Sequence, residues 1–365
     1  MVPPRRSARL EGRRDAQPPN QTRGTSVLST DTETSQTLPS LLEAAKDRVG
    51  QYQPNNRREE AKLQTGLTAF LGWLPEGGRE SVARDILSAT TDDEVHGVFI
   101  NLLTALAMPM KARSRTSSVI QSPHSKRRQA VESVAATLDE PEERKKSFRK
   151  SCMQRDGYCC VASGNMDIDE YKARGRPSGV DSCYVEGVHI IPFAYASWDN
   201  TVAPPEQTAS AWEVLWRCFP RVRQVGMQVA SINDLSNGIT LRGSLHREFG
   251  RFQIAFKPTN VPNVYERKLF PDFATVESRT LPSSPRIEFT RAPGTENYAL
   301  PSAALLDCHY RLAEILNASG MAEVIDEQWR RWEDLRESTG GSVHPDGKTD
   351  IGGYLNAALW ERVVG

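Results

Sequence analysis

Three short motifs, far apart in the chain but in a fixed order, limit the fold more than any other feature of this sequence. They are VHIIPF at 188–193, NGITL at 237–241 and LHREF at 245–249. The first is an apolar strand pattern closed by Pro192, the second is a turn that leads into a strand, and the third starts a helix. The sequence therefore predicts a strand–strand–helix unit. His189 should lie at a strand end, Asn237 in a turn and His246 near a helix start.

These motifs and their flanks are similar to those of one known family. They resemble the HNH endonucleases, also called ββα-metal or His-Me finger nucleases, in the subgroup with the pattern HIIPF…NGxxL…LHxxF. The spacing of nine from Asn237 to His246 is one that HNH modules commonly show. The upstream RDGYCCVASG looks like the lead-in of that subgroup, and the continuation FGRFQIAFKPT is similar to its fungal members. The resemblance covers about residues 145–260, with a weaker likeness at LPSAALLDCHYRLAEILNASG.

The resemblance implies a separate chemical role for each motif residue. His189 is expected to be the general base, because a neutral imidazole can take a proton from water near pH 7. Asn237 is expected to tie down the hairpin loop and so to orient His189. His246 is expected to bind a weakly held divalent metal, Mg²⁺ or Mn²⁺, which would act as a Lewis acid on the phosphate. The implied activity is metal-dependent hydrolysis of DNA phosphodiester bonds.

Two positions depart from the metal-ligand pattern of many HNH modules. Val188 stands where Asp, Glu or His often precedes the base, and Gly250 stands where His or Asp often follows the helix histidine by four residues. Glu186, three residues before His189, is the predicted replacement ligand. Odd spacing on a strand puts these two residues on opposite faces, so Glu186 needs a bulge or a strand end to reach the site. Further candidate ligands are Asp181, Asp234 and Glu248.

Each motif residue also has a purely structural explanation when it is taken alone. A histidine beside two isoleucines is commonly a core residue, and an Asn-Gly pair is commonly only a turn. Because Val188 and Gly250 offer no ligand, the alternative function is a non-catalytic nucleic-acid-binding or protein-interaction protein that retains a degenerate HNH scaffold. A third interpretation is a zinc-stabilised DNA-binding module. It depends on Cys159, Cys160 and Cys183, and the sequence has no CxxC pair.

Composition and periodicity predict an α+β fold in five segments. These are a disordered stretch (1–40), a helical domain (41–110), a basic linker (111–142), an HNH nuclease-like domain (143–260) and a mostly helical C-terminal extension (261–365). An insert of 47 residues separates His189 from Asn237, and a helix with Trp212 and Trp216 on one face is its predicted core. Further expected elements are a strand over 157–164 and helices over 301–317, 320–337 and 353–363.

The charge of the chain is balanced but unevenly distributed. With 46 basic and 46 acidic residues, the net charge does not by itself indicate a nucleic-acid partner. Residues 111–150, however, carry eleven Lys and Arg against five Asp and Glu. From the basic helix over 142–155, we expect Arg149, Lys150 and Arg155 to contact nucleic-acid phosphates. Such runs are also common in solvated linkers.

The same patterns bear on location and on partners. No apolar run reaches about 18 residues, so a membrane span is not expected. The Arg- and Pro-rich N-terminus lacks the apolar core of a secretion signal, so the protein is expected to be intracellular and not secreted. Basic clusters over 111–128 resemble a bipartite import signal, which indicates the nucleus. Residues 41–110 are the predicted surface for self-association.

Overall fold

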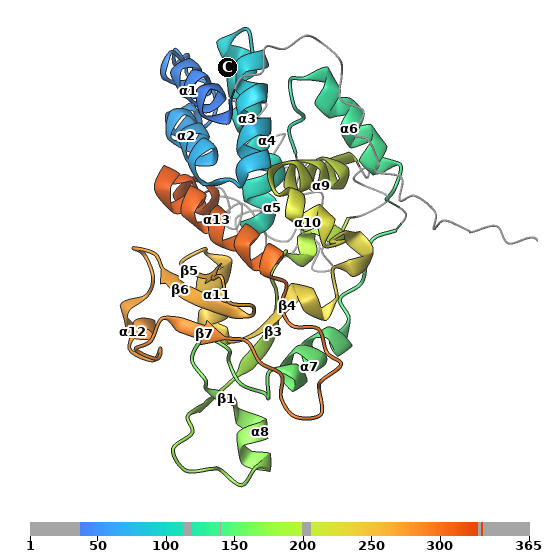
Figure 1. Ribbon diagram of the computed structural model, residues 1–365, viewed down its shortest axis with the longest axis vertical. Helices are drawn as coiled ribbons and strands as arrows, with labels where there is room; N and C mark the ends of the chain where they lie inside the picture. Colours follow the sequence, from blue (N-terminus) through green and yellow to red (C-terminus); the bar gives the residue numbers. More distant parts are fainter. Residues whose placement is uncertain (1–36, 112–118, 139, 199–205, 328–329, 331–365) are drawn as a thin grey trace, which may run out of the picture. The chain divides into compact units, whose positions relative to one another are not determined.

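A computed structural model describes residues 37–111, 119–138, 140–198, 206–327 and 330 (Figure 1). Helices and three small sheets occur together in these residues, which agrees with the predicted α+β class. The predicted disorder of residues 1–40 lies largely outside the described residues. At its end the structure differs from the prediction, because Leu38 already begins a helix. No helix in the described ranges is long and apolar enough to cross a membrane.

The first part of the described chain is helical, as its apolar periodicity predicts. The elements are α1 (Leu38–Gly50), η1 (Glu60–Lys62), α2 (Leu63–Trp73), α3 (Glu76–Ser88), α4 (Asp92–Leu102), the π-helical turn η2 (Leu103–Ala107) and α5 (Met108–Lys111). Residues that precede proline avoid the helical conformation, and α2 accordingly ends where Leu74 becomes extended before Pro75. Thr91 caps α4 in a reciprocal capping box with Glu94.

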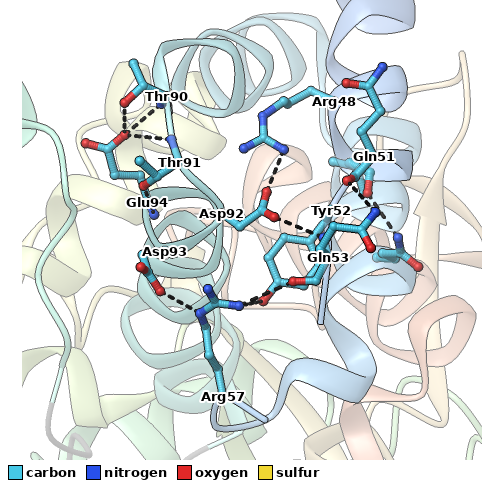
Figure 2. Close-up of polar contacts among 12 residues, drawn as sticks. Arg48, Gln51, Tyr52, Gln53, Arg57, Thr90, Thr91, Asp92, Asp93 and Glu94 are labelled. Atoms are coloured by element: carbon cyan, nitrogen blue, oxygen red, sulfur yellow. Dashed lines mark hydrogen bonds and ion pairs between the residues drawn. The ribbon is translucent and has the colours of Figure 1, made fainter. Parts of the chain in front are cut away.

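A network of charged side chains fastens the loop after α1 to the start of α4 (Figure 2). Arg48 pairs with Asp92 at 2.9 Å. Arg57 contacts both Glu60, at 3.1 Å, and Asp93, at 2.6 Å. Because these carboxylates lie in the first turn of α4 or in η1, the two arginines join three helical elements of the N-terminal part.

The segment before the first motif contains α6 (Ser125–Ala135), α7 (Lys146–Arg155), β1 (Met166–Asp167) and α8 (Ile168–Ala173). The predicted strand over 157–164 is wrong, since within it only Cys159 forms an isolated β-bridge, to Met166. The physical reason is the backbone at Gly157 and Tyr158, where φ is 64° and 61° and the chain turns instead of extending.

In its described part, the insert between the first two motifs contains short helices joined by turns. It contains η3 (Phe193–Ala196), α9 (Glu206–Cys218), α10 (Pro220–Gln224), η4 (Val229–Ser231) and η5 (Leu235–Asn237). Trp212 is fully buried and its indole N–H donates to the Tyr195 carbonyl, while Trp216 packs partly buried beside it. Arg217 on α9 pairs with Asp85 on α3 at 2.8 Å, so the insert is tied to the N-terminal helices.

Two antiparallel sheets are formed by the chain from Val185 onward, and the first of them contains the start of the first motif. They consist of β3 (Val185–His189) with β4 (Gly238–Arg242), and of β5 (Ile254–Pro258), β6 (Val264–Leu269) and β7 (Arg286–Glu288). Between them lies α11 (Gly243–Gly250), while β2 (Ser182–Cys183) pairs with β1 and α12 (Thr275–Ser278) follows β6. The pairing of β5 with β6 crosses the predicted boundary at residue 260, and β6 and β7 show that the segment beyond it is not only helical.

One long helix, α13 (Ala303–Ser319), packs against both α2 and β5 (Figure 1). Residues 321–327 are also helical, whereas the helix predicted over 353–363 lies outside the described residues. Because α13 and α9 contact the N-terminal helices, the segment predicted as a separate helical domain over 41–110 shares one core with the rest.

Candidate functional site

The first two motifs meet on the β3–β4 hairpin, where His189 stands opposite Gly238. Helix α7 packs directly on this hairpin. The approach is so close that a Cβ atom at Gly238 would lie 2.4 Å from Cys152 Sγ and 2.8 Å from Phe148 Cζ, both on α7. The glycine of the NGITL motif is therefore needed for packing, because it lets α7 reach the end of the strand that carries His189.

The His189 ring is held on several sides at the end of β3. It stacks on Phe148 with 3.9 Å between the ring centroids and 9° between the planes, and Phe193 lies 5.8 Å away at a tilt. The ring atom Nε2 is 3.3 Å from Asn233 Oδ1. Burial lowers the pKa of His189 from 6.5 to about 4, although the contact with Asn233 raises it. The imidazole is therefore neutral at pH 7.

The Asn237 side chain is completely buried and all of its hydrogen bonds go to backbone atoms. Its Oδ1 accepts the Ile191 N–H at 2.8 Å, and its Nδ2 donates to the carbonyls of Ile191, at 3.0 Å, and Ile232, at 2.9 Å. These bonds join the chain just after His189 to the turn that precedes β4. Asn237 does not touch the His189 ring in a hydrogen bond, so any effect on that ring passes through the backbone.

His246 and Glu186 form a pair across the start of α11. The Nδ1 atom of His246 lies 2.6 Å from Glu186 Oε2, and the two side chains are 43% and 44% exposed. An ionised carboxylate can only accept, so Nδ1 donates when Glu186 is ionised, and in a neutral imidazole this leaves the lone pair on Nε2. The sequence prediction required a bulge or a strand end at Glu186, but β3 pairs with β4 in an unbroken register from Val185 to His189. The contact of Glu186 is with His246 of α11.

The other predicted ligands do not join this pair. Among the residues that the structure describes, no three His, Cys, Asp or Glu side chains gather as a metal-binding group. Glu248 is buried beside Arg251, and Val188 is buried with no ligand atom to offer. Cys159, Cys160 and Cys183 are free thiols outside any such group, so the zinc-stabilised interpretation has no cluster to support it in the described ranges.

His189 and His246 line the same cleft, which has a volume of about 1000 Å³. Four arginines of the described chain also line it, namely Arg144, Arg247, Arg251 and Arg330. Acidic side chains that include Glu323 and Asp326 reach it from the chain beyond α13. The cleft thus combines a neutral imidazole, a half-exposed His–Glu pair and several positive charges, which together can hold a phosphate group and move a proton beside it.

Comparison with known proteins identifies a family for one region of the chain. Residues 160–257 match a family model described as HNH endonuclease. We refer to these residues as the HNH region; it contains all three motifs and indicates a nuclease-type function with nucleic acid as partner. No curated protein and no solved structure matches the chain.

The basic helix α7, just before the HNH region, contains the three residues predicted to contact nucleic acid. Arg149 and Lys150 are exposed, and Arg149 also donates to the Val185 carbonyl at 3.1 Å. The prediction for Arg155 is wrong, because its side chain is completely buried. It pairs with Asp156 at 2.7 Å and donates to three backbone carbonyls, those of Leu235, Gly238 and Ala299. Its positive charge holds the fold together instead of facing a ligand.

Three residues around the site were not predicted from the sequence. Phe148 and Asn233 hold the His189 ring, and His309 on α13 lines the cleft. The ring of His309 is buried, and its Nε2 lies 3.0 Å from the Phe249 carbonyl on α11. The weak likeness of the α13 sequence to the same family was the one available signal for His309. Neither Phe148 nor Asn233 belongs to a motif.

Proposed function

We propose that the protein is a metal-dependent HNH endonuclease that hydrolyses DNA phosphodiester bonds. In this proposal it belongs to the fungal HIIPF…NGxxL…LHxxF subgroup, and β3, β4 and α11 are its ββα-metal module. The observation that carries the proposal is that His189 and His246 line one cleft in the region that matches the HNH family model, with Glu186 bonded to His246.

In this mechanism His189 takes a proton from the attacking water. Because burial lowers its pKa to about 4, the ring is neutral and able to accept a proton throughout the neutral range. A base with such a low pKa is weaker than one tuned close to pH 7. A substrate phosphate in the cleft would offset this, since a nearby negative charge stabilises the imidazolium and raises its pKa.

The His246–Glu186 pair fits a weakly held divalent metal. It offers one imidazole nitrogen and one carboxylate, both half exposed, which leaves room for water and phosphate oxygens as the other ligands. A bound metal would supply Lewis-acid stabilisation of the phosphate and of the leaving oxygen. Because Nδ1 bonds to Glu186, the other nitrogen, Nε2, would be the metal ligand. Glu186 then either orients His246 or binds the metal itself.

Nucleic acid would be held by the positive side chains at and near the cleft. Arg144, Arg247 and Arg251 line the cleft, and the exposed Arg149 and Lys150 extend the positive surface along α7. Such contacts neutralise phosphates and release counterions, so binding should weaken steeply with salt. We propose DNA as the nucleic acid that binds there.

The proposed location in the nucleus and the proposed self-association depend on sequence patterns. The import signal over 111–128 includes Arg127, which bonds to Asp85 and Ser81, and this contact limits access to that cluster. Residues 112–118 lie outside the described residues. An intracellular, nuclear location and self-association through 41–110 are expectations from the sequence alone.

The experiment is cleavage of supercoiled plasmid DNA by the full-length protein. We expect nicking with Mg²⁺ or Mn²⁺ that EDTA stops. His189→Ala should reduce the rate by about 10²- to 10⁴-fold, the usual contribution of a general base. The matched control is His96→Ala on α4, since Nε2 of His96 bonds to the Arg58 carbonyl at 2.7 Å and His96 is not among the residues that line the cleft. Equal cleavage by wild type and His189→Ala would contradict the assignment of the base.

The second candidate function is a non-catalytic protein that keeps an HNH scaffold for nucleic-acid or protein binding. The specific observation in its favour is that no third ligand joins Glu186 and His246 in the described part of the chain. This function predicts salt-sensitive DNA binding with no metal-dependent nicking, and binding that His189→Ala leaves unchanged. The two measurements together separate the two functions.

A further inference from the structure

Asn233 lies in the turn between η4 and η5, and it is the hydrogen-bonding partner of the His189 ring. We propose that Asn233 is a positioning residue that fixes the tautomer of His189, so that Nε2 carries the proton and Nδ1 is the atom that accepts a proton from water. The catalytic part of this inference rests on the proposed nuclease function; the tautomer itself does not.

The orientation of the Asn233 amide follows from its second contact. Its Nδ2 lies 3.1 Å from the backbone carbonyl of Glu143. A carbonyl oxygen can only accept a hydrogen bond, so the atom that faces it must be the NH₂ group. The other end of the amide, Oδ1, therefore faces His189.

The orientation of the amide in turn determines the state of the imidazole. Oδ1 of Asn233 is an acceptor, so Nε2 of His189 must be the donor at 3.3 Å. A neutral imidazole carries only one ring proton, which leaves Nδ1 as the base. The Nδ1 atom makes no hydrogen bond with the described residues, so its lone pair is available to a water molecule.

The aromatic neighbours leave the ring few other choices. Phe148 covers one face of the imidazole at 3.9 Å, and Phe193 lies at its side. With the plane of the ring set in this way, the main remaining freedom is a half-turn that exchanges the two edges of the ring. Stacking alone does not favour either edge, whereas the hydrogen bond to Asn233 does.

The motif residue Asn237 stabilises the backbone next to both His189 and Asn233. It bonds to Ile191, two residues after His189, and to Ile232, the residue before Asn233. One buried side chain thus holds the backbone on both sides of the His189–Asn233 contact. This gives Asn237 a physical route to the base, although the two side chains do not form a hydrogen bond.

The direct test is nitrogen-15 NMR of histidine-labelled full-length protein at pH 7. Protonated and unprotonated ring nitrogens of neutral imidazole have well separated shifts, and a His189→Gln spectrum identifies the signals of His189. We expect a single tautomer with Nε2 protonated in the wild type, and a mixture in Asn233→Leu, which has similar volume but no acceptor. Ser236→Ala, in the adjacent helical turn η5, changes no charge; it is the matched control and should match the wild type.

Cleavage kinetics provide the second readout. Asn233→Leu should lower kcat by about ten- to a hundredfold, within the range of a general-base contribution, while KM changes little. Asn233→Asp keeps an acceptor that needs no orienting and should restore most of the rate. The added carboxylate should also move the acid limb of the pH–rate profile to higher pH, because it stabilises the imidazolium against the opposing charge of Arg144. The readout that a residue with only a structural role would not change is the tautomer of His189 in Asn233→Leu, measured by the NMR experiment.

The outcomes separate this inference from the proposed function. A wild-type spectrum with Nδ1 protonated overturns the inference whether or not the protein cleaves DNA. The same holds for an unchanged tautomer in an Asn233→Leu protein that circular dichroism shows to be folded. If the wild type shows the expected tautomer but no cleavage, the positioning of the ring stands and the nuclease function fails.

Discussion

The imidazole of His309 lies flat against the ring of Phe249, with 3.6 Å between the ring centroids and 1° between the planes. The ring of Phe252 also stacks on the imidazole of His309, with 4.4 Å between the ring centroids. His309 belongs to α13 and Phe249 to α11, so a residue far outside the HNH region fixes the helix that carries His246. The cleft therefore depends on the whole described fold and not on the motifs alone.

The burial of His309 and His189 predicts a loss of stability in acid. Their folded pKa values, about 3 and about 4, lie below the ordinary value of 6.5, so the unfolded chain takes up these protons first. The contribution of these two histidines to the free energy of unfolding is fully present above about pH 6.5. It is lost as the pH falls toward their folded pKa values. Urea unfolding at pH 7.5 and pH 5 should differ by about 2 kcal/mol per histidine. His309→Phe, which keeps the stacking, should show a smaller difference, and equal differences would contradict the assignment.

The packing of α7 on the hairpin predicts opposite results for two glycine variants. Gly238→Ala would place a methyl group against Cys152 and Phe148, which should cost about 1–3 kcal/mol and disturb the ring that stacks on His189. Gly250→Ala is the matched control, because its Cβ would meet nothing within 4 Å. It should leave stability unchanged or raise it by up to about 1 kcal/mol. Thermal unfolding and plasmid nicking measure both effects, and a tolerated Gly238→Ala would disprove the close approach.

Gly250 also offers a test of the metal site. It follows His246 by four residues on α11, so the two positions lie on one helix face, and both line the cleft. Gly250→His should tighten Mn²⁺ binding by about tenfold, the size of change that mutations at metal sites commonly produce. Calorimetric titration against Gly250→Ala gives the comparison. An unchanged affinity in a folded Gly250→His protein would show that this face of α11 does not hold the metal.

Arg155 and Lys150 lie on the same basic helix and should respond differently to substitution. Arg155→Ala leaves the buried Asp156 without its partner and should destabilise the fold by about 3–5 kcal/mol. Lys150→Ala removes an exposed charge and should leave the unfolding free energy within about 0.5 kcal/mol. In fluorescence titrations, Lys150→Ala should instead reduce the salt dependence of DNA binding by about one phosphate contact. A stable Arg155→Ala protein with weakened DNA binding would contradict the structural role of Arg155 and support a contact with nucleic acid.

Much of the fold could be predicted from local patterns in the sequence. The apolar spacing of α2 and α9, the proline after α2 and the turn before β4 each act over a few residues, and the structure agrees with them. The motif order placed His189 on a strand end and His246 on a helix, because period-2 and helical patterns lie directly beside them. Local signals were sufficient for these elements.

The partners of the site residues could not be predicted in the same way. Asn233 is 44 residues from His189 and His309 is 60 residues from Phe249, so each contact depends on how a long insert or a later helix returns to the hairpin. Arg155 was misassigned because a charge pattern does not reveal burial. The carbonyls that accept hydrogen bonds from the Arg155 side chain lie 80, 83 and 144 residues further along the chain.

The pairing of β5 with β6 across residue 260 decides how small a folded piece of this protein can be. A chain that ends at Thr259 would keep every motif residue, yet the edge of β5 would lose its hydrogen-bonding neighbour and α11 would lose the ring of His309. Exposed strand edges with apolar residues such as Ile254 and Phe256 promote aggregation. The boundary of the matched family region is thus not a boundary at which the molecule can be cut.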